Sequence, residues 1–65
     1  ALETAKRAYE LAPDHASIGD TYGWILYKAD KVEDAKIILE KALELDPKNE
    51  EIRHHIEKMM AATNN

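Results

Sequence analysis

Two adjacent histidines, His54 and His55, are the residues whose types come nearest to a metal site. Glu51 precedes His55 by four residues, so those two side chains would share one face of a helix. His54 and His55 point about 100° apart on a helix, and ligands on different faces do not easily hold one ion. No third strong ligand is predicted nearby. We therefore interpret both histidines as surface residues of a polar helix face, and the sequence predicts no metal.

The sequence holds no constellation of residues that would carry out catalysis. It has no glycine-rich phosphate loop, no nucleophile elbow and no His-Glu-x-x-His spacing. Its 65 residues form one small domain, which is a smaller scaffold than most enzymes need. The sequence therefore predicts that the chain is not an enzyme and that it uses no cofactor.

Charge and composition narrow the range of partners. The 13 acidic and 9 basic residues give a formal net charge of −4, which makes nucleic acid and anionic membranes poor partners. No apolar run approaches the roughly 18 residues that suggest a membrane-spanning helix, so we expect no membrane insertion. The chain lacks cysteine, and therefore has no disulfide and no thiolate metal site. A chain without cysteine fits the cytosol and the periplasm equally well, so the composition does not indicate a compartment.

Apolar residues recur at intervals of three and four, which is typical of helices with one buried face. Pro13 and Pro47 each end a helix, since proline disfavours helical geometry in the residue before it. No run alternates with the period of two that a strand would show. The predicted fold class is all-α, with about four antiparallel helices joined by short turns. The helices are expected at 1–12, 15–29, 30–46 and from 49 onward, with fraying at 63–65.

Short polar residues are predicted to cap three of these helices. Asp14 is expected to cap the second helix, and Asn49 the fourth. Asp30 and Glu33 have the spacing of a variant capping box, so the third helix should begin there.

Gly19 and Gly23 lie four residues apart in the second helix, where each costs about 1 kcal/mol relative to alanine. We interpret the pair as a point where another helix approaches closely, with Ala35 and Ala42 allowing that approach from the opposite side. The residues expected to face inward are Ala1, Ala5, Ala8, Tyr9, Ala12, Ile18, Tyr22, Ile25, Leu26, Ala29, Val32, Ala35, Ile38, Leu39, Ala42, Leu43, Leu45, Ile52, Ile56, Met59 and Met60.

The chain contains an internal repeat, because Pro13 and Pro47 are 34 residues apart. The residues that end there read Arg-Ala-Tyr-Glu-Leu-Ala-Pro and Lys-Ala-Leu-Glu-Leu-Asp-Pro, so most of the paired positions match or keep their character. A helix-turn-helix period of 34 residues resembles the tetratricopeptide repeat. Gly23, Ala35 and Pro47 match the pattern of that family by identity.

Two positions depart from the family's pattern. Gly19 stands where the family usually has a bulky residue, and Asp30 stands in a turn where it prefers glycine. Asp tolerates left-handed backbone geometry better than most residues, so we expect the turn to form. The stretch 20–28, with its Gly-Trp pair before Leu-Tyr, is similar to a version common in bacterial repeat proteins.

The resemblance implies a division of the chain into three parts. Residues 1–14 would be the second helix of a preceding repeat, and residues 15–48 a complete repeat. Residues 49–65 would be the first helix of a following repeat or a C-terminal capping helix.

The resemblance also implies a protein-protein interaction scaffold that binds a peptide or helix of a partner on a concave face, lined by the first helices of the repeats. Trp24 and Tyr27 would be its anchors, although Trp24 could instead be a structural residue that packs against the first or last helix. A groove with Asp20, Trp24 and Tyr27 would suit an apolar or basic segment. The expected partner-binding residues are Ser17, Asp20, Trp24, Tyr27, Lys28, Glu51, His54, His55 and Lys58.

A second hypothesis is self-assembly without a separate ligand. The chain holds about two repeat equivalents, whereas roughly three are usually needed for a stable stack. The chain begins at Ala1 without methionine, so we expect a piece of a longer protein that associates in a symmetric dimer or swap. A third hypothesis is an accessory segment of an enzyme whose catalytic domain lies elsewhere in the parent chain.

Overall fold

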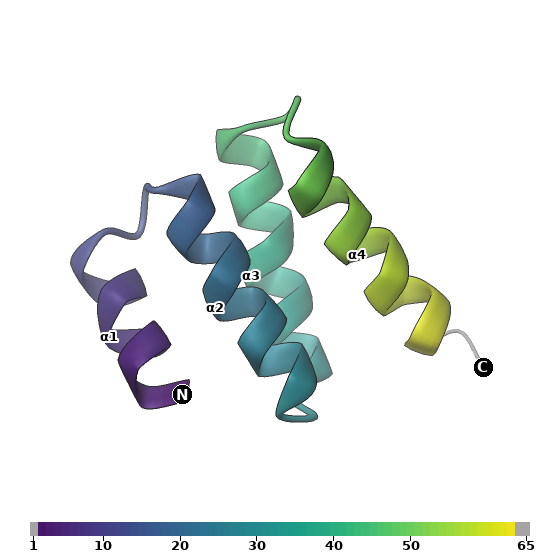
Figure 1. The fold of residues 1–65 in the computed structure, drawn as a ribbon, viewed down its shortest axis with the longest axis horizontal. Helices are drawn as coiled ribbons and strands as arrows, with labels where there is room; N and C mark the ends of the chain where they lie inside the picture. The colour runs from purple at the N-terminus through teal and green to yellow at the C-terminus, as the bar shows by residue number, and fades with distance from the viewer. Residues whose placement is uncertain (1, 64–65) are drawn as a thin grey trace.

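The computed structural model describes residues 2–63 and consists there of four α-helices joined by short turns (Figure 1). They are α1 (Leu2–Leu11), α2 (Ala16–Lys28), α3 (Val32–Leu45) and α4 (Glu50–Thr63). The described part of the chain contains no strand, so the all-α prediction is confirmed. The helix α4 includes Thr63, which was expected to fray, whereas Ala1, Asn64 and Asn65 lie outside the described residues.

The helices α2 and α3 form the central pair of the molecule. The helix α1 packs on the free side of α2, while α4 packs on α3 and also contacts α2. In Figure 1 α2 and α4 both lie nearer to the viewer than α3, which is seen between them. No helix within residues 2–63 has the length and apolar character needed to cross a membrane.

The core lies where α2, α3 and α4 meet. Its centre is Leu39 of α3, which is fully buried. Three residues expected in the core are exposed, namely Ala29, Leu45 and Met60. Ala29 and Leu45 lie at the ends of α2 and α3, where no neighbouring helix covers them, and Met60 lies one residue past the buried Met59. The buried apolar residues are Leu26, Ala35, Leu39, Ala42, Ile52, Ile56 and Met59.

The close approach of α2 and α3 at Gly23 is confirmed. A Cβ atom at Gly23 would lie 2.6 Å from Cγ of Leu39, which is nearer than such atoms pack. A Cβ atom at Gly19 would lie 3.3 Å from Cβ of Ala42, a tight distance that a small shift could accommodate. The same Cβ atom would lie 3.6 Å from Cε1 of Tyr9 in α1, which is an ordinary contact distance. The glycine that departs from the family's pattern therefore lies against both α3 and α1.

The turn between α2 and α3 forms around Asp30, whose φ of 67° is left-handed. The N–H of Asp30 donates to the carbonyl of Tyr27 at 3.0 Å, and the N–H of Lys31 donates to that of Leu26 at 2.9 Å. These two bonds make a Schellman motif, in which a left-handed residue ends the helix. The predicted capping box is wrong, because a residue in this conformation cannot also be an N-cap in extended geometry.

The two other caps have different outcomes. The N–H of Ile52 donates to Oδ1 of Asn49 at 3.1 Å, so the predicted cap of α4 is confirmed. The predicted cap of α2 is wrong, because His15, and not Asp14, occupies the N-cap position. His15 has the extended backbone of an N-cap but makes no capping hydrogen bond with its side chain.

Replacing Asp30 with Gly is expected to stabilise the fold by about 0.5 to 1 kcal/mol, because glycine adopts left-handed geometry without steric cost. Asp30→Ala, which keeps the Cβ atom and loses the polar group, is expected to destabilise it by about 1 kcal/mol. Thermal unfolding followed by circular dichroism measures both. An alanine variant as stable as the glycine variant would contradict the role of this conformation.

Replacing Gly23 with Ala is expected to lower the free energy of unfolding by about 1 to 2 kcal/mol, although alanine favours helices, because the new Cβ atom would overlap Leu39. Gly19→Ala is the matched control, since it adds the same methyl group where more space remains. Chemical denaturation of both variants gives the difference. The packing explanation fails if Gly23→Ala is at least as stable as Gly19→Ala.

Candidate interaction face

A polar and aromatic cluster joins α2 to α4 on one side of the molecule. We call it the α2–α4 face and define it by Asp20, Trp24, Tyr27, Lys28, His54 and His55. The first four come from α2 and the two histidines from α4, so the face exists only because the fold places these helices side by side.

The deepest part of this face is a contact between Asp20 and His55. The side chain of Asp20 is only 7% exposed, and its Oδ1 lies 2.7 Å from Nδ1 of His55. A carboxylate can only accept hydrogen bonds, so the Nδ1–H of His55 is the donor. A buried carboxylate needs such a partner, because burial without one is costly. The contact therefore fixes the imidazole ring against α2.

The ring of His55 in turn supports Trp24. The two rings stack with their centroids 4.4 Å apart and an interplanar angle of 21°. The ring of Tyr27 lies 5.1 Å from that of Trp24, and Nζ of Lys28 lies 5.4 Å from the Trp24 centroid, within cation–π range. Trp24 and Tyr27 are half-buried, so both keep part of their surface in contact with solvent. Trp24 thus packs against the last helix while it remains partly open.

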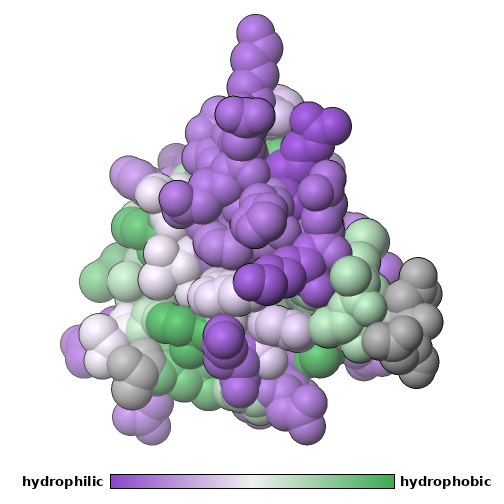
Figure 2. All heavy atoms as spheres, turned by 45° about the vertical axis from the view of Figure 1, so that its right-hand side comes forward, coloured by the Kyte–Doolittle hydropathy of each residue, from purple (hydrophilic) through white to green (hydrophobic). Residues whose placement is uncertain are grey.

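The other residues expected to bind a partner are dispersed around this cluster. Ser17 is exposed near the start of α2, and its carbonyl accepts a hydrogen bond from the Thr21 hydroxyl at 3.1 Å. The ring of His54 lies 6.5 Å from that of His55. Glu51 and Lys58 are exposed on α4, and Glu51 lines a shallow hollow together with His54 and other charged residues of that helix. Figure 2 shows the upper part of the visible face as almost entirely hydrophilic.

The sequence alone did not indicate the role of Asp20. Its spacing predicts that it shares a helix face with Trp24 and that its carboxylate is available to a basic partner. The partner that buries this charge, His55, lies 35 residues away in the sequence. Only the packing of α4 on α2 brings the two together, and no local pattern signals it.

A second feature that sequence reasoning missed is a groove between α1 and α2, of about 280 Å³. Its lining surface is mostly apolar, although three of its residues are polar. The repeat offers the signal that could have found its apolar part, because Ala5, Ala8 and Ile18 correspond to residues that are buried in the core, namely Leu39, Ala42 and Ile52. We call it the α1–α2 groove, and it is lined by Ala5, Ala8, His15, Ser17, Ile18 and Thr21.

Comparison with known proteins agrees with this architecture. A sequence profile of the tetratricopeptide repeat matches residues 1–59, so the chain belongs to the tetratricopeptide repeat family. Repeats of this family generally mediate protein–protein interactions and form a scaffold that is not catalytic. Searches of the curated proteins and of the solved structures found no match.

Replacing His55 with Ala is expected to lower the free energy of unfolding by on the order of 2 kcal/mol, because the Asp20 carboxylate would stay buried without a partner. His54→Ala removes an exposed neighbouring imidazole and is the matched control, with an expected change below about 0.5 kcal/mol.

The loss at His55 also includes the stacking on Trp24, so a double-mutant cycle separates the two contributions. Asp20→Ala combined with His55→Ala should cost less than the sum of the single variants, because the double variant leaves no unpaired charge. Additive losses would show that Asp20 and His55 do not act as a pair.

Proposed function

We propose that the chain is a protein-interaction module that binds an extended peptide or a helix of a partner protein on the α2–α4 face. The observation that carries this proposal is the half-exposed pair of aromatic rings at Trp24 and Tyr27, held in place by His55. Rigid aromatic side chains bury a large area on binding at little cost in conformational entropy. The division into 1–14, 15–48 and 49–65 fits the proposal, since α2 and α4 would then be the first helices of their repeats.

The residues of the face divide into two groups by their burial. Trp24, Tyr27 and Lys28 offer surface to a partner from α2, and His54 and Lys58 do so from α4. Asp20 and His55 act behind them as positioning residues, because their polar atoms already satisfy each other. Ser17 and Glu51 lie at the border of this surface and would contact a ligand that extends beyond the aromatic rings.

The charge of the face indicates the chemistry of the partner. The helix α2 carries only two formal charges, and since Asp20 is buried under His55, Lys28 is the one it exposes. Lys58 adds a second positive charge from α4, opposed by Glu51 at the border. An apolar segment flanked by acidic residues therefore complements this face better than a basic segment does. This differs from the expectation based on sequence, because Asp20 does not offer its charge to a ligand.

Reversing the exposed charges is the direct test. Lys28→Glu combined with Lys58→Glu should reduce the capture of partner proteins from a lysate of the source cell by roughly tenfold, because like charges would face the partner. Lys36→Glu combined with Lys41→Glu makes the same change in net charge on exposed positions of α3 and should leave capture unchanged.

Circular dichroism must show equal helicity for both double variants and the unmodified chain. Captured proteins are identified and quantified by mass spectrometry. Equal capture by both variants would remove the α2–α4 face as the binding site.

A second candidate function is self-assembly without a separate ligand. The uncovered α1–α2 groove favours it, because apolar surface of this kind on a small domain is usually covered by a protein contact.

A further inference from the structure

The hydrogen bond between His55 and Asp20 uses only one of the two nitrogens of the imidazole ring. Nδ1 of His55 donates to Oδ1 of Asp20, so the neutral ring carries its proton on Nδ1 and keeps a lone pair on Nε2. The two ring nitrogens point in different directions, so Nε2 is directed away from the buried carboxylate. The fold therefore fixes which nitrogen of His55 can accept a hydrogen bond.

This second nitrogen is open to a ligand. Within residues 2–63 Nε2 of His55 has no hydrogen-bond partner, and no unpartnered side-chain nitrogen or oxygen atom there is buried. Nε2 therefore reaches the surface, although the side chain of His55 is only 21% exposed. The ring is bonded to Asp20 and stacked on Trp24, so the acceptor is already ordered before a ligand binds.

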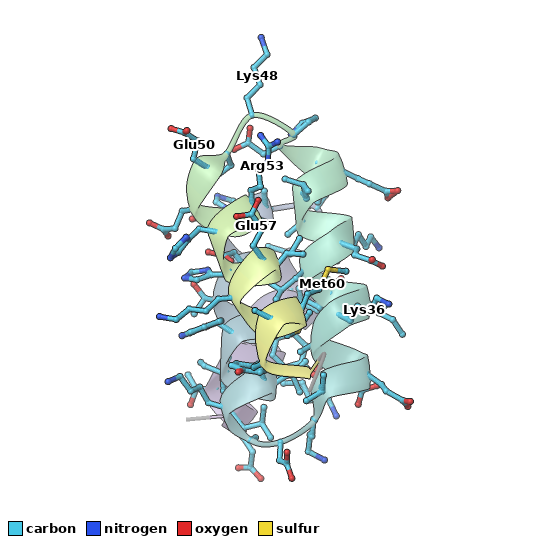
Figure 3. All side chains as sticks on the ribbon, turned by 90° about the vertical axis from the view of Figure 1, so that its right-hand side faces the viewer. Lys36, Lys48, Glu50, Arg53, Glu57 and Met60 are labelled. Atoms are coloured by element: carbon cyan, nitrogen blue, oxygen red, sulfur yellow. The ribbon has the colours of Figure 1, made fainter. Side chains whose placement is uncertain are left out.

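The nearest charged residues of opposite sign on α4 lie on another side of the helix. Figure 3 shows Arg53 and Glu57 along the outer side of α4. They form an ion pair of 3.9 Å with each other. Residues two positions apart do not share a helix face, so neither side chain lies beside the ring of His55. Nε2 thus stays available on the side of α4 that meets α2.

A backbone N–H is the donor that best matches this acceptor. The centroid of the His55 ring lies 4.4 Å from that of Trp24, so a residue that covers the indole brings its own backbone close to Nε2. Every residue except proline carries an N–H group. In a helix these groups are bonded internally beyond the first turn, whereas in an extended segment they are free. An extended segment is therefore complementary to Nε2, and the middle of a helix is not.

We propose that Nε2 of His55 accepts a hydrogen bond from a backbone N–H of the partner, beside the apolar side chain that covers Trp24. The ligand of the α2–α4 face is then an extended peptide segment and not a helix. This inference rests on the proposed function, which left both forms of ligand open. It gives His55 a direct contact with the ligand in addition to its support of Trp24. Asp20 is a positioning residue in this arrangement, since it acts on the ligand only through His55.

The tautomer of His55 is tested first, without a ligand. Nitrogen NMR spectra of the imidazole rings, recorded at a pH where the same spectra show His55 to be neutral, should place its proton on Nδ1. His54 is the control within the molecule, because its ring is exposed and has no carboxylate partner among the described residues, so it should show both tautomers. A neutral His55 with its proton on Nε2 would overturn the proposal.

Peptide probes test the contact itself. Short random peptides displayed on phage are selected on the unmodified chain, and those that also bind Trp24→Ala are discarded. In synthetic copies of a selected peptide, each backbone N–H is replaced in turn by the oxygen of an ester. One replacement should weaken binding by roughly fivefold, because the ester keeps the shape of the backbone and removes one donor.

A double variant links that donor to His55. Asp20→Ala combined with His55→Phe keeps an aromatic ring beside Trp24, removes Nε2 and leaves no unpaired charge. It should bind the unmodified peptide roughly fivefold more weakly, and the sensitive ester should cause no further loss. His54→Phe is the matched control and should retain the full effect of the ester. The ring spectra and the ester scan use the unmodified chain, so they do not depend on how the double variant folds.

The outcomes separate this inference from the proposed function. If no selected peptide depends on Trp24, the α2–α4 face is not a binding site and both proposals fail. If Trp24-dependent peptides have no sensitive N–H, or the effect of the ester persists in the double variant, only the contact with Nε2 is overturned. Selected peptides that circular dichroism shows to be helical in the complex would overturn the extended ligand and leave the face as a binding site.

Discussion

The packing of Leu39 against Gly23 is the contact on which the rest of the structure depends. The absence of a side chain at Gly23 lets α3 approach α2 until Leu39 is fully buried. At this separation α4 can seat Ile52 and Ile56 in the core and still touch α2. A larger residue at Gly23 would move α3 away from α2, and α4 would move with α3. The distance between the polar sides of α2 and α4 is therefore set by a contact in the apolar core.

The α2–α4 face is a consequence of that distance. Asp20 is buried because α4 covers it, and its burial is tolerated because His55 donates a hydrogen bond to it. The same imidazole stacks on the indole of Trp24. The buried contact between Asp20 and His55 therefore holds in place an aromatic ring that is partly exposed. The two interpretations of Trp24, as a packing residue and as a binding anchor, are therefore compatible. One side of the ring packs on α4 while part of its surface stays open.

Local patterns predicted the helices and much of the core, because periodicity and proline act within a few residues of the chain. The cap at Asn49 was predictable for the same reason. Asp30 shows the limit of this reasoning, since its spacing to Glu33 fitted a capping box while its place at the end of α2 required left-handed geometry. The Asp20–His55 pair was not predictable, because a contact across 35 residues depends on how three helices pack and not on any local spacing.

The helix α2 connects the two surfaces of the molecule. Ser17 and Thr21 line the α1–α2 groove, while Asp20 and Trp24 of the same helix belong to the α2–α4 face. In the repeat, Thr21 corresponds to His55, the residue through which α4 meets α2. A helix seated in the groove would thus contact α2 at Thr21 much as α2 contacts α4, and it would extend the interaction face by one further helix. The size of the surface that we propose for partner binding is therefore coupled to whether the groove is filled.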